Sequence, residues 1–236
     1  MGNKRCRSCL AVEAAFAANL HHAHTRDRAT LDASVSKHLM QPNLLYLAEF
    51  ADGSIKVGTS TESRSEVRLR EQGALAARFV ARASDGIAVR ELEDRVTAEF
   101  GVAQSVSIRR KLDGLVQRGT SDVQTSDLDR LTTEVAGLLV TMGDDRLSPL
   151  DQRWEHPNAH AAAWLNPHRY PFRIDEGEHS FEVIEACGRV VALRQQGSDG
   201  SLSSDVFVVD IGVLFGVVIE LGEHGAPEIT LQDSLF

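Results

Sequence analysis

The chain has 236 residues, 42% of them hydrophobic and 25% charged, which is typical of a globular protein with one large domain or two small ones. No apolar run approaches the roughly 20 residues of a membrane-spanning helix, and the basic N-terminus is not followed by the apolar stretch of a secretory signal. Three cysteines do not suggest a disulfide framework. We therefore expect a cytoplasmic protein with no membrane partner.

The net charge of −9 is distributed unevenly along the chain. Residues 54–111 carry 11 Lys and Arg against 8 Asp and Glu, whereas residues 112–236 carry 8 against 21. A protein that binds nucleic acid without sequence preference normally gathers basic side chains on one face, because contacts with phosphates dominate its affinity. The acidic C-terminal half disfavours nucleic acid as a partner without excluding it, and a protein partner is the alternative.

The first 43 residues are predicted to form an N-terminal arm with a helix over residues 10–20, which are rich in strong helix formers. Cys6 and Cys9 have the spacing of half a zinc site, because two intervening residues let both thiolates reach one tetrahedral ion. Two members of a nearby histidine cluster would complete a structural Zn²⁺ site: His21, His22, His24 or His38. The alternative is a pair of unbound thiols beside a histidine-rich arm.

Residues 44–142 are predicted to form an α/β core with a following helix. The Asp52-Gly53 pair is favoured in tight hairpin turns, and Gly73 is a helix stop signal. Apolar residues at four-residue steps from Ala88 to Phe100 predict a helix with one buried stripe. The predicted elements are strands at 44–50, 55–58 and 75–83 and helices at 64–72, from residue 85 or 86 onward, and at 126–142.

Residues 143–236 are predicted to contain a connector and a β-rich C-terminal region. The connector, 143–160, is polar and turn-prone. Cys187 is expected to be a small buried residue between strands. Glycine-containing turns separate the predicted strands, which lie at 181–186, 189–194, 206–211 and 217–221. The prediction for this region is a small antiparallel sheet or half-barrel, which makes the whole chain α+β.

The order hairpin, helix, strand, helix carries Tyr46 on the first strand, Arg68 on the first helix and Glu93 on the second helix. This order resembles the GIY-YIG nuclease superfamily, with residues 44–46 at its first signature and Lys56-Val57-Gly58 at its second. The chain is still more similar to an uncharacterised prokaryotic family, domain of unknown function 2797. That family shows a Tyr-Leu-Ala strand, a Lys-Val-Gly strand and an arginine before a Gln-Gly-Ala step, all of which are present here. The resemblance implies a GIY-YIG-like core.

Phosphodiester hydrolysis is the chemistry that the resemblance implies. Glu93 would hold one Mg²⁺ or Mn²⁺ ion, Arg68 would stabilise developing negative charge, and Tyr46 would activate or position water. Lys56 replaces the second signature tyrosine and would contact an anionic group in its place. Tyr46, Arg68 and Glu93 also have ordinary structural interpretations, Tyr46 as a packed tyrosine and the other two as solvated charges on helix surfaces.

Three functions are compatible with this sequence. The first is a metal-dependent nuclease or nucleic-acid-processing enzyme of GIY-YIG type. The second is a binding module that kept the fold but lost the reaction, and that contacts nucleic acid or a protein partner. The third is an enzyme in which the same cleft acts on a small anionic substrate. Because Lys56 replaces a signature tyrosine, the first and second are given about equal weight.

Overall fold

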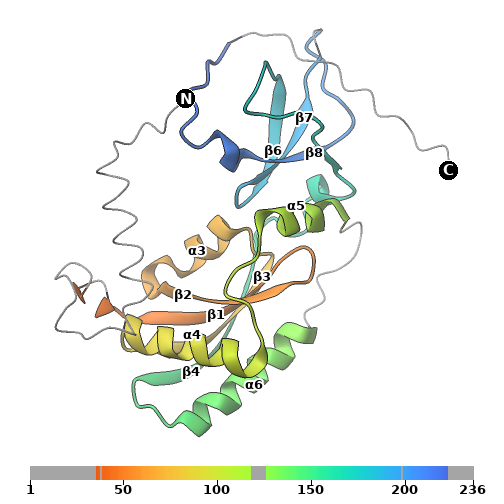
Figure 1. Cartoon of the computed structure of the whole chain (residues 1–236). Helices are drawn as coiled ribbons and strands as arrows, with labels where there is room; N and C mark the ends of the chain where they lie inside the picture. The colour runs from red at the N-terminus through yellow and green to blue at the C-terminus, as the bar shows by residue number, and fades with distance from the viewer. Residues whose placement is uncertain (1–35, 38, 118–125, 198, 223–236) are drawn as a thin grey trace.

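The computed structural model describes residues 36–37, 39–117, 126–197 and 199–222 (Figure 1). These residues form a mixed α+β structure with two four-stranded sheets and a β-rich C-terminal region. The predicted N-terminal helix and the candidate zinc ligands lie outside the described residues. Across the described ranges, none of the helices combines the length and apolar character needed to cross a membrane.

The first sheet has the strand order β2-β1-β3-β4, and all its neighbouring strands are antiparallel. Its strands are β1 (Asn43–Glu49), β2 (Ile55–Thr61), β3 (Ala76–Ala83) and β4 (Leu147–Glu155). The helical elements of this part are η3 (Glu62–Arg64), α3 (Ser65–Gln72), α4 (Gly86–Phe100), α5 (Ile108–Gln117) and α6 (Ser126–Met142).

The second sheet has the order β5-β8-β7-β6 and is mixed, since β5 runs parallel to β8 while the other neighbours are antiparallel. Its strands are β5 (His168–Arg169), β6 (Phe181–Cys187), β7 (Val190–Gln195) and β8 (Phe207–Asp210), and two short 3₁₀ helices accompany them, η4 (Ala162–Trp164) and η5 (Ile211–Leu214).

Strand β1 lies inside the first sheet, and all seven of its residues are buried. Because successive side chains of a strand point to opposite faces, Leu45 and Leu47 pack with α4 and α6, whereas Tyr46 and its neighbours pack with Leu69 of α3 and Phe79 of β3. Figure 1 shows α4 and α6 together on one side of the sheet. The core of this part therefore has two layers, one on each face of β1.

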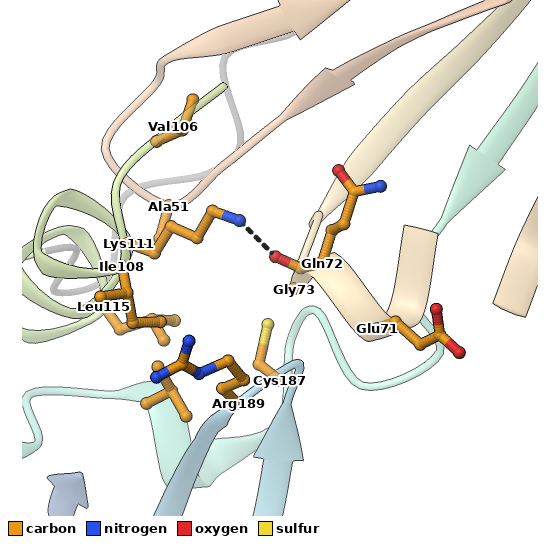
Figure 2. Close-up of a pocket in the computed structure, with 11 residues that line it drawn as sticks. Ala51, Glu71, Gln72, Gly73, Val106, Ile108, Lys111, Leu115, Cys187 and Arg189 are labelled. Carbon is orange, nitrogen blue, oxygen red and sulfur yellow. Dashed lines mark hydrogen bonds between the residues drawn. The ribbon is translucent and has the colours of Figure 1, made fainter. Parts of the chain in front are cut away.

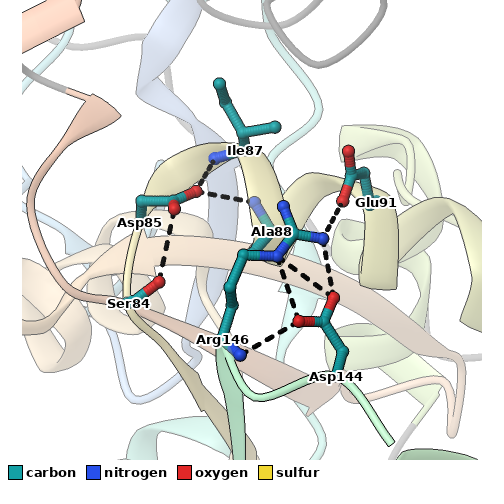
Figure 3. Close-up of polar contacts among 7 residues, drawn as sticks. All are labelled: Ser84, Asp85, Ile87, Ala88, Glu91, Asp144 and Arg146. Carbon is teal, nitrogen blue, oxygen red and sulfur yellow. Dashed lines mark hydrogen bonds and ion pairs between the residues drawn. The ribbon is translucent and has the colours of Figure 1, made fainter. Parts of the chain in front are cut away.

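The predicted start of the second helix, at residue 85 or 86, and the predicted stop signal at Gly73 are both confirmed. Asp85 is the N-cap of α4, and its carboxylate accepts hydrogen bonds from the backbone N–H groups of Ile87 (2.9 Å) and Ala88 (2.8 Å), as Figure 3 shows. Gly73 follows α3 in the left-handed conformation, with φ of 71°. The predicted helices and strands between residues 44 and 100, the helix at 126–142 and three of the C-terminal strands are also present.

Several predictions of secondary structure are wrong. The supposed connector at 143–160 contains β4, whose residues are mostly exposed because it is the outer strand of the sheet and does not need an apolar sequence. Helix α5 was not predicted. Residues 217–221 form no strand. The second sheet is not purely antiparallel, because the two-residue strand β5 adds to its outer side in parallel.

Arg146 connects α4 to the turn between α6 and β4 (Figure 3). Its guanidinium Nη2 donates to Glu91 Oε2 at 2.7 Å and to Asp144 Oδ2 at 2.6 Å, and its Nε donates to Asp144 Oδ1 at 3.0 Å. These contacts raise the pKa of Arg146 above its ordinary value, the hydrogen bonds to Asp144 contributing most. The polar strand β4 is thus fixed in its register by charge as well as by its ladder with β3.

Helix α5 lies between the two sheets (Figure 1). Its Leu115 belongs to an apolar cluster that also contains Leu75, just before β3 of the first sheet, and Val208 of the second sheet. On the other side, a Cβ placed on Gly114 would lie 2.5 Å from the backbone nitrogen of Asp52, so the helix touches the β1–β2 turn. The two sheets are therefore joined through packed side chains and one close backbone contact.

We expect the substitution Gly114→Ala to destabilise the protein by about 1–3 kcal/mol, because the new methyl group would collide with the backbone at Asp52. Gly137→Ala is the matched control, since Gly137 also lies within a helix but a Cβ there has nothing within 4 Å. That substitution should stabilise the protein by about 0.5–1 kcal/mol, as alanine favours helix. Urea unfolding measures both effects, and equal effects of the two substitutions would contradict this packing of α5.

Candidate functional site

Tyr46 of β1 is buried against β2. It lies opposite Gly58, and a Cβ added to Gly58 would be 2.5 Å from the Tyr46 hydroxyl oxygen, so glycine leaves the space that the phenol ring occupies. The hydroxyl accepts a 2.7 Å hydrogen bond from Nε2 of Gln72. Burial raises the pKa of Tyr46, and the hydrogen bond from Gln72 and the charge of Arg68 only partly oppose this. The phenol is therefore a neutral hydroxyl group near neutral pH.

Lys56 of β2 lies over the Tyr46 ring. Its Nζ lies 5.8 Å from the centre of the Tyr46 ring and donates a 3.3 Å hydrogen bond to the carbonyl oxygen of Gln104. Only 9% of Lys56 is exposed. Burial, followed by the charges of Arg68 and Lys111, lowers the pKa of Lys56 to about 8. This lysine can thus change its charge within one or two pH units of neutrality.

Arg68 on α3 and Glu93 on α4 both act electrostatically on Tyr46 and Lys56. Arg68 is about half exposed and lies 3.8 Å from Glu71. Glu93 is buried, and its Oε2 accepts a 2.6 Å hydrogen bond from Nη1 of Arg90. Besides the effect of burial, the charge of Arg68 lowers and that of Glu93 raises the pKa values of Tyr46 and Lys56. The four predicted residues therefore lie within electrostatic reach of one another.

A cavity of about 300 Å³, which Arg68 lines, is bounded by β2, η3, α3 and the start of α4. Its charged lining residues are three arginines and one glutamate, namely Arg64, Arg68, Arg90 and Glu71. The lining is cationic even though the chain as a whole carries a charge of −9. An anion is the ligand that such a cavity favours. We call it the α3–α4 cavity.

The carboxylates near this cavity do not form a complete metal site by themselves. Over the ranges that the structure describes, no group of three or more His, Cys, Asp and Glu residues could hold a metal ion. Glu93 supplies one carboxylate, and Mg²⁺ in enzymes is often bound by one or two carboxylates together with substrate phosphates and water. Glu93, the predicted ligand, is buried and already paired with Arg90, so a cation there would also need ligands from a bound phosphate and water.

A second, smaller cavity of about 160 Å³ lies where α3, α5 and the second sheet meet (Figure 2). Lys111 extends toward α3, and its Nζ donates a 2.7 Å hydrogen bond to the backbone oxygen of Gln72. Burial lowers the pKa of Lys111. Cys187 lines this cavity and is only 3% exposed, so the expectation of a buried cysteine is confirmed. This cavity connects the end of α3 to the second sheet.

Sequence reasoning missed three residues at the site. Arg90 was not considered, although it precedes Glu93 by three residues and therefore shares its face of α4. Gln72 was noted only as part of a motif, yet its amide reaches Tyr46, and its Oε1 is buried with no hydrogen-bond partner in the structure as described. Ser60 carried no signal, because its importance depends on the neighbouring helices.

Comparison with known proteins gives one match. Residues 2–165 match the family described as "Protein of unknown function (DUF2797)". No curated protein and no solved structure matches the chain.

We expect Lys56→Met to stabilise the protein at pH 7, because the folded protein no longer has to bury a charge. Below pH 8, Lys56 is protonated in both the folded and the unfolded chain; between pH 8 and 10.5 only the unfolded chain keeps the proton, so the wild type gains stability as the pH rises. The advantage of the variant, up to roughly 3 kcal/mol, should therefore shrink over that range. Urea unfolding at pH 7, 8.5 and 10 measures it.

The exposed Lys37 provides the matched control, and Lys37→Met should not stabilise the protein at pH 7, because it removes no buried charge. A Lys56→Met advantage that stayed constant from pH 7 to 10 would show that the lysine is not the group with the lowered pKa.

Proposed function

The chain belongs to the DUF2797 family of proteins of unknown function, and we propose that it is a GIY-YIG-like enzyme that binds nucleic acid at the β2 side of the first sheet and hydrolyses a phosphodiester bond there. The observation that carries this proposal is the electrostatic coupling of Tyr46 and Lys56 to Arg68 and Glu93, together with the cationic cavity that Arg68 lines. These residues come from four separate elements, so their proximity is not a consequence of sequence spacing. The hairpin, helix, strand and helix that carry them are in the order expected for a GIY-YIG-like core.

Arg68 is the residue best placed to meet the substrate. Its side chain is about half exposed, lines the cavity and contacts Glu71 at 3.8 Å, so it can turn toward a phosphate. A guanidinium group offers two parallel N–H donors to phosphate oxygens, and a donor aimed at developing negative charge stabilises the transition state. We assign this role to Arg68.

Tyr46 and Lys56 differ in what they can do with a proton. Because burial disfavours the phenolate, Tyr46 acts in this proposal as a neutral hydroxyl group that positions water. Lys56, with a pKa of about 8, is mostly a cation at pH 7 and attracts the phosphate, whereas near pH 8 a large fraction is neutral and can accept a proton. Lys56 therefore replaces the missing tyrosine with a group that titrates closer to neutrality.

Glu93 would hold the divalent cation in this proposal, with the remaining ligands coming from the substrate phosphate and water. A bound Mg²⁺ or Mn²⁺ ion would neutralise phosphate charge and make a coordinated water a better nucleophile. Arg90 currently occupies Oε2 of Glu93, so the cation has to share this carboxylate or displace the arginine from it. Arg90 remains next to the cavity in either case and can contact the anion.

The second candidate function is binding without cleavage. It is favoured by the 2.6 Å ion pair between Arg90 and Glu93, which satisfies the carboxylate without a metal, and by the nearly complete burial of Tyr46. In this case the same arginines would hold a nucleic acid, or a small anionic molecule, with no reaction. Metal-dependent product formation separates this function from the first.

We expect Mn²⁺-dependent cleavage of at least one member of a panel of single-stranded, duplex and branched nucleic acids. Glu93→Gln and Arg68→Ala should each reduce the rate by about 100-fold or more, because each removes a group that acts on the transition state. Gel electrophoresis of labelled substrates, with and without Mn²⁺, measures the products.

Matched controls come from the same two helices. Arg70→Ala and Glu99→Gln change exposed side chains that pair with Glu66 and Arg95 away from the cavity, and both variants should cleave at the wild-type rate. Metal-independent binding that is lost in Arg68→Ala, with no product from any substrate, would favour the binding module. Absence of both binding and cleavage at low salt would remove nucleic acid as the substrate.

A further inference from the structure

Ser60 lies at the edge of the α3–α4 cavity and has a hydroxyl group that nothing in the described structure satisfies. The residue is 9% exposed, and its Oγ is buried with no hydrogen-bond partner in the part of the chain that the structure describes. It lies on β2 opposite Leu44 and lines the cavity. A buried hydroxyl group without a hydrogen-bond partner costs free energy. Its presence beside a cavity therefore points to a ligand that accepts a hydrogen bond from it.

The charges around Ser60 indicate an anionic ligand. Arg64 of η3, Arg68 of α3 and Arg90 of α4 all line the cavity. Arg64 is paired with Glu71 at 2.8 Å, and Arg90 is 22% exposed and paired with Glu93, so each arginine has N–H groups beyond those that its carboxylate partner uses. Three guanidinium groups but only one carboxylate, that of Glu71, are among the residues that line the cavity. The surplus of donors suits a group with several anionic oxygens.

The backbone N–H groups at the N-terminus of α4 are not the groups that bind this anionic ligand. The backbone N–H groups of Ile87 and Ala88 already donate to the carboxylate of Asp85, so the first turn of the helix has its own anion. The ligand must therefore be held by side chains, and a hydroxyl group flanked by arginines is a common way to bind a phosphate.

We infer that the α3–α4 cavity is a phosphate subsite in which Ser60 donates a hydrogen bond to a phosphate oxygen and Arg64 and Arg90 neutralise the charge. The phosphate belongs either to the interior of a nucleic-acid strand, next to the one that Arg68 contacts, or to a terminal phosphate monoester. Its attachment to a nucleic acid rests on the proposed function, whereas phosphate binding itself rests only on the cavity and its residues.

Calorimetric titration of the full chain with inorganic phosphate at low ionic strength tests the subsite. Ser60→Ala should weaken binding about tenfold, as expected for the loss of a hydrogen bond to a charged group, and Arg64→Gln should weaken it severalfold. The controls are Ser148→Ala and Arg82→Gln, which alter an exposed serine of β4 and an arginine of β3 paired with Glu62, and neither should change the affinity. Sulfate should compete with phosphate, and acetate should compete poorly. Thermal melting of each variant checks that it is folded.

Oligonucleotides with a 5′-phosphate, a 3′-phosphate or neither distinguish the two sources of the phosphate. Equal, Ser60-dependent affinity for all three places an internal phosphate in the subsite, and a gain that requires one terminal phosphate and is lost in Ser60→Ala places that terminus there. Ser60-dependent phosphate binding with no affinity for any oligonucleotide would keep the subsite and overturn the nucleic-acid function. Nucleic-acid cleavage or binding that Ser60→Ala leaves unchanged, or phosphate binding equal in wild type and Ser60→Ala, would overturn the subsite.

Discussion

The contact between Tyr46 and Gly58 determines how the first sheet and its site are built. The phenol lies where any side chain at position 58 would have to be, so β1 and β2 approach each other in one register only. A shift by one residue would turn Leu45 and Leu47 away from α4 and α6 and would expose apolar surface on both faces. The same register brings Lys56 and Ser60 to the face of β2 on which Tyr46 lies. The charged residues are therefore positioned by a packing constraint.

Much of the first sheet could be predicted from sequence because its inner strands and helices carry regular apolar patterns. The alternation in β1 and the four-residue steps in α4 are direct consequences of burial. Strand β4 was not predicted, because an outer strand with mostly exposed side chains has no such pattern. The strand predicted at Val217–Leu221 is absent, because an apolar run does not form a strand without a neighbouring strand to pair with. Helix α5 is short and packs against the second sheet and the β1–β2 turn. Its formation therefore depends on tertiary contacts more than on a pattern in its own sequence.

The residues of the candidate site also fall into a group that could be predicted from the sequence and a group that could not. Tyr46, Lys56, Arg68 and Glu93 could be selected because the order of elements and the residue types at their ends resemble a known pattern. Ser60 and Arg64 could not, since their relation to Arg90 arises only when β2, α3 and the start of α4 meet around the cavity. Gln72 was noted as part of a motif, but its hydrogen-bond partner Tyr46 is 26 residues away in the sequence. Spacing along a chain does not reveal such a pairing.

The close approach of Gly73 and Gly188 has a mechanical consequence for the site. A Cβ on Gly188 would lie 2.7 Å from the backbone nitrogen of Gly73, so the β6–β7 turn rests directly on the end of α3 with no side chain between them. Lys111 fixes the same end of α3 through the carbonyl oxygen of Gln72. Flexible side chains at a domain boundary absorb small displacements, whereas two backbones in contact transmit them. A displacement of the second sheet would therefore move the end of α3 and, one helical turn away, the backbone of Arg68.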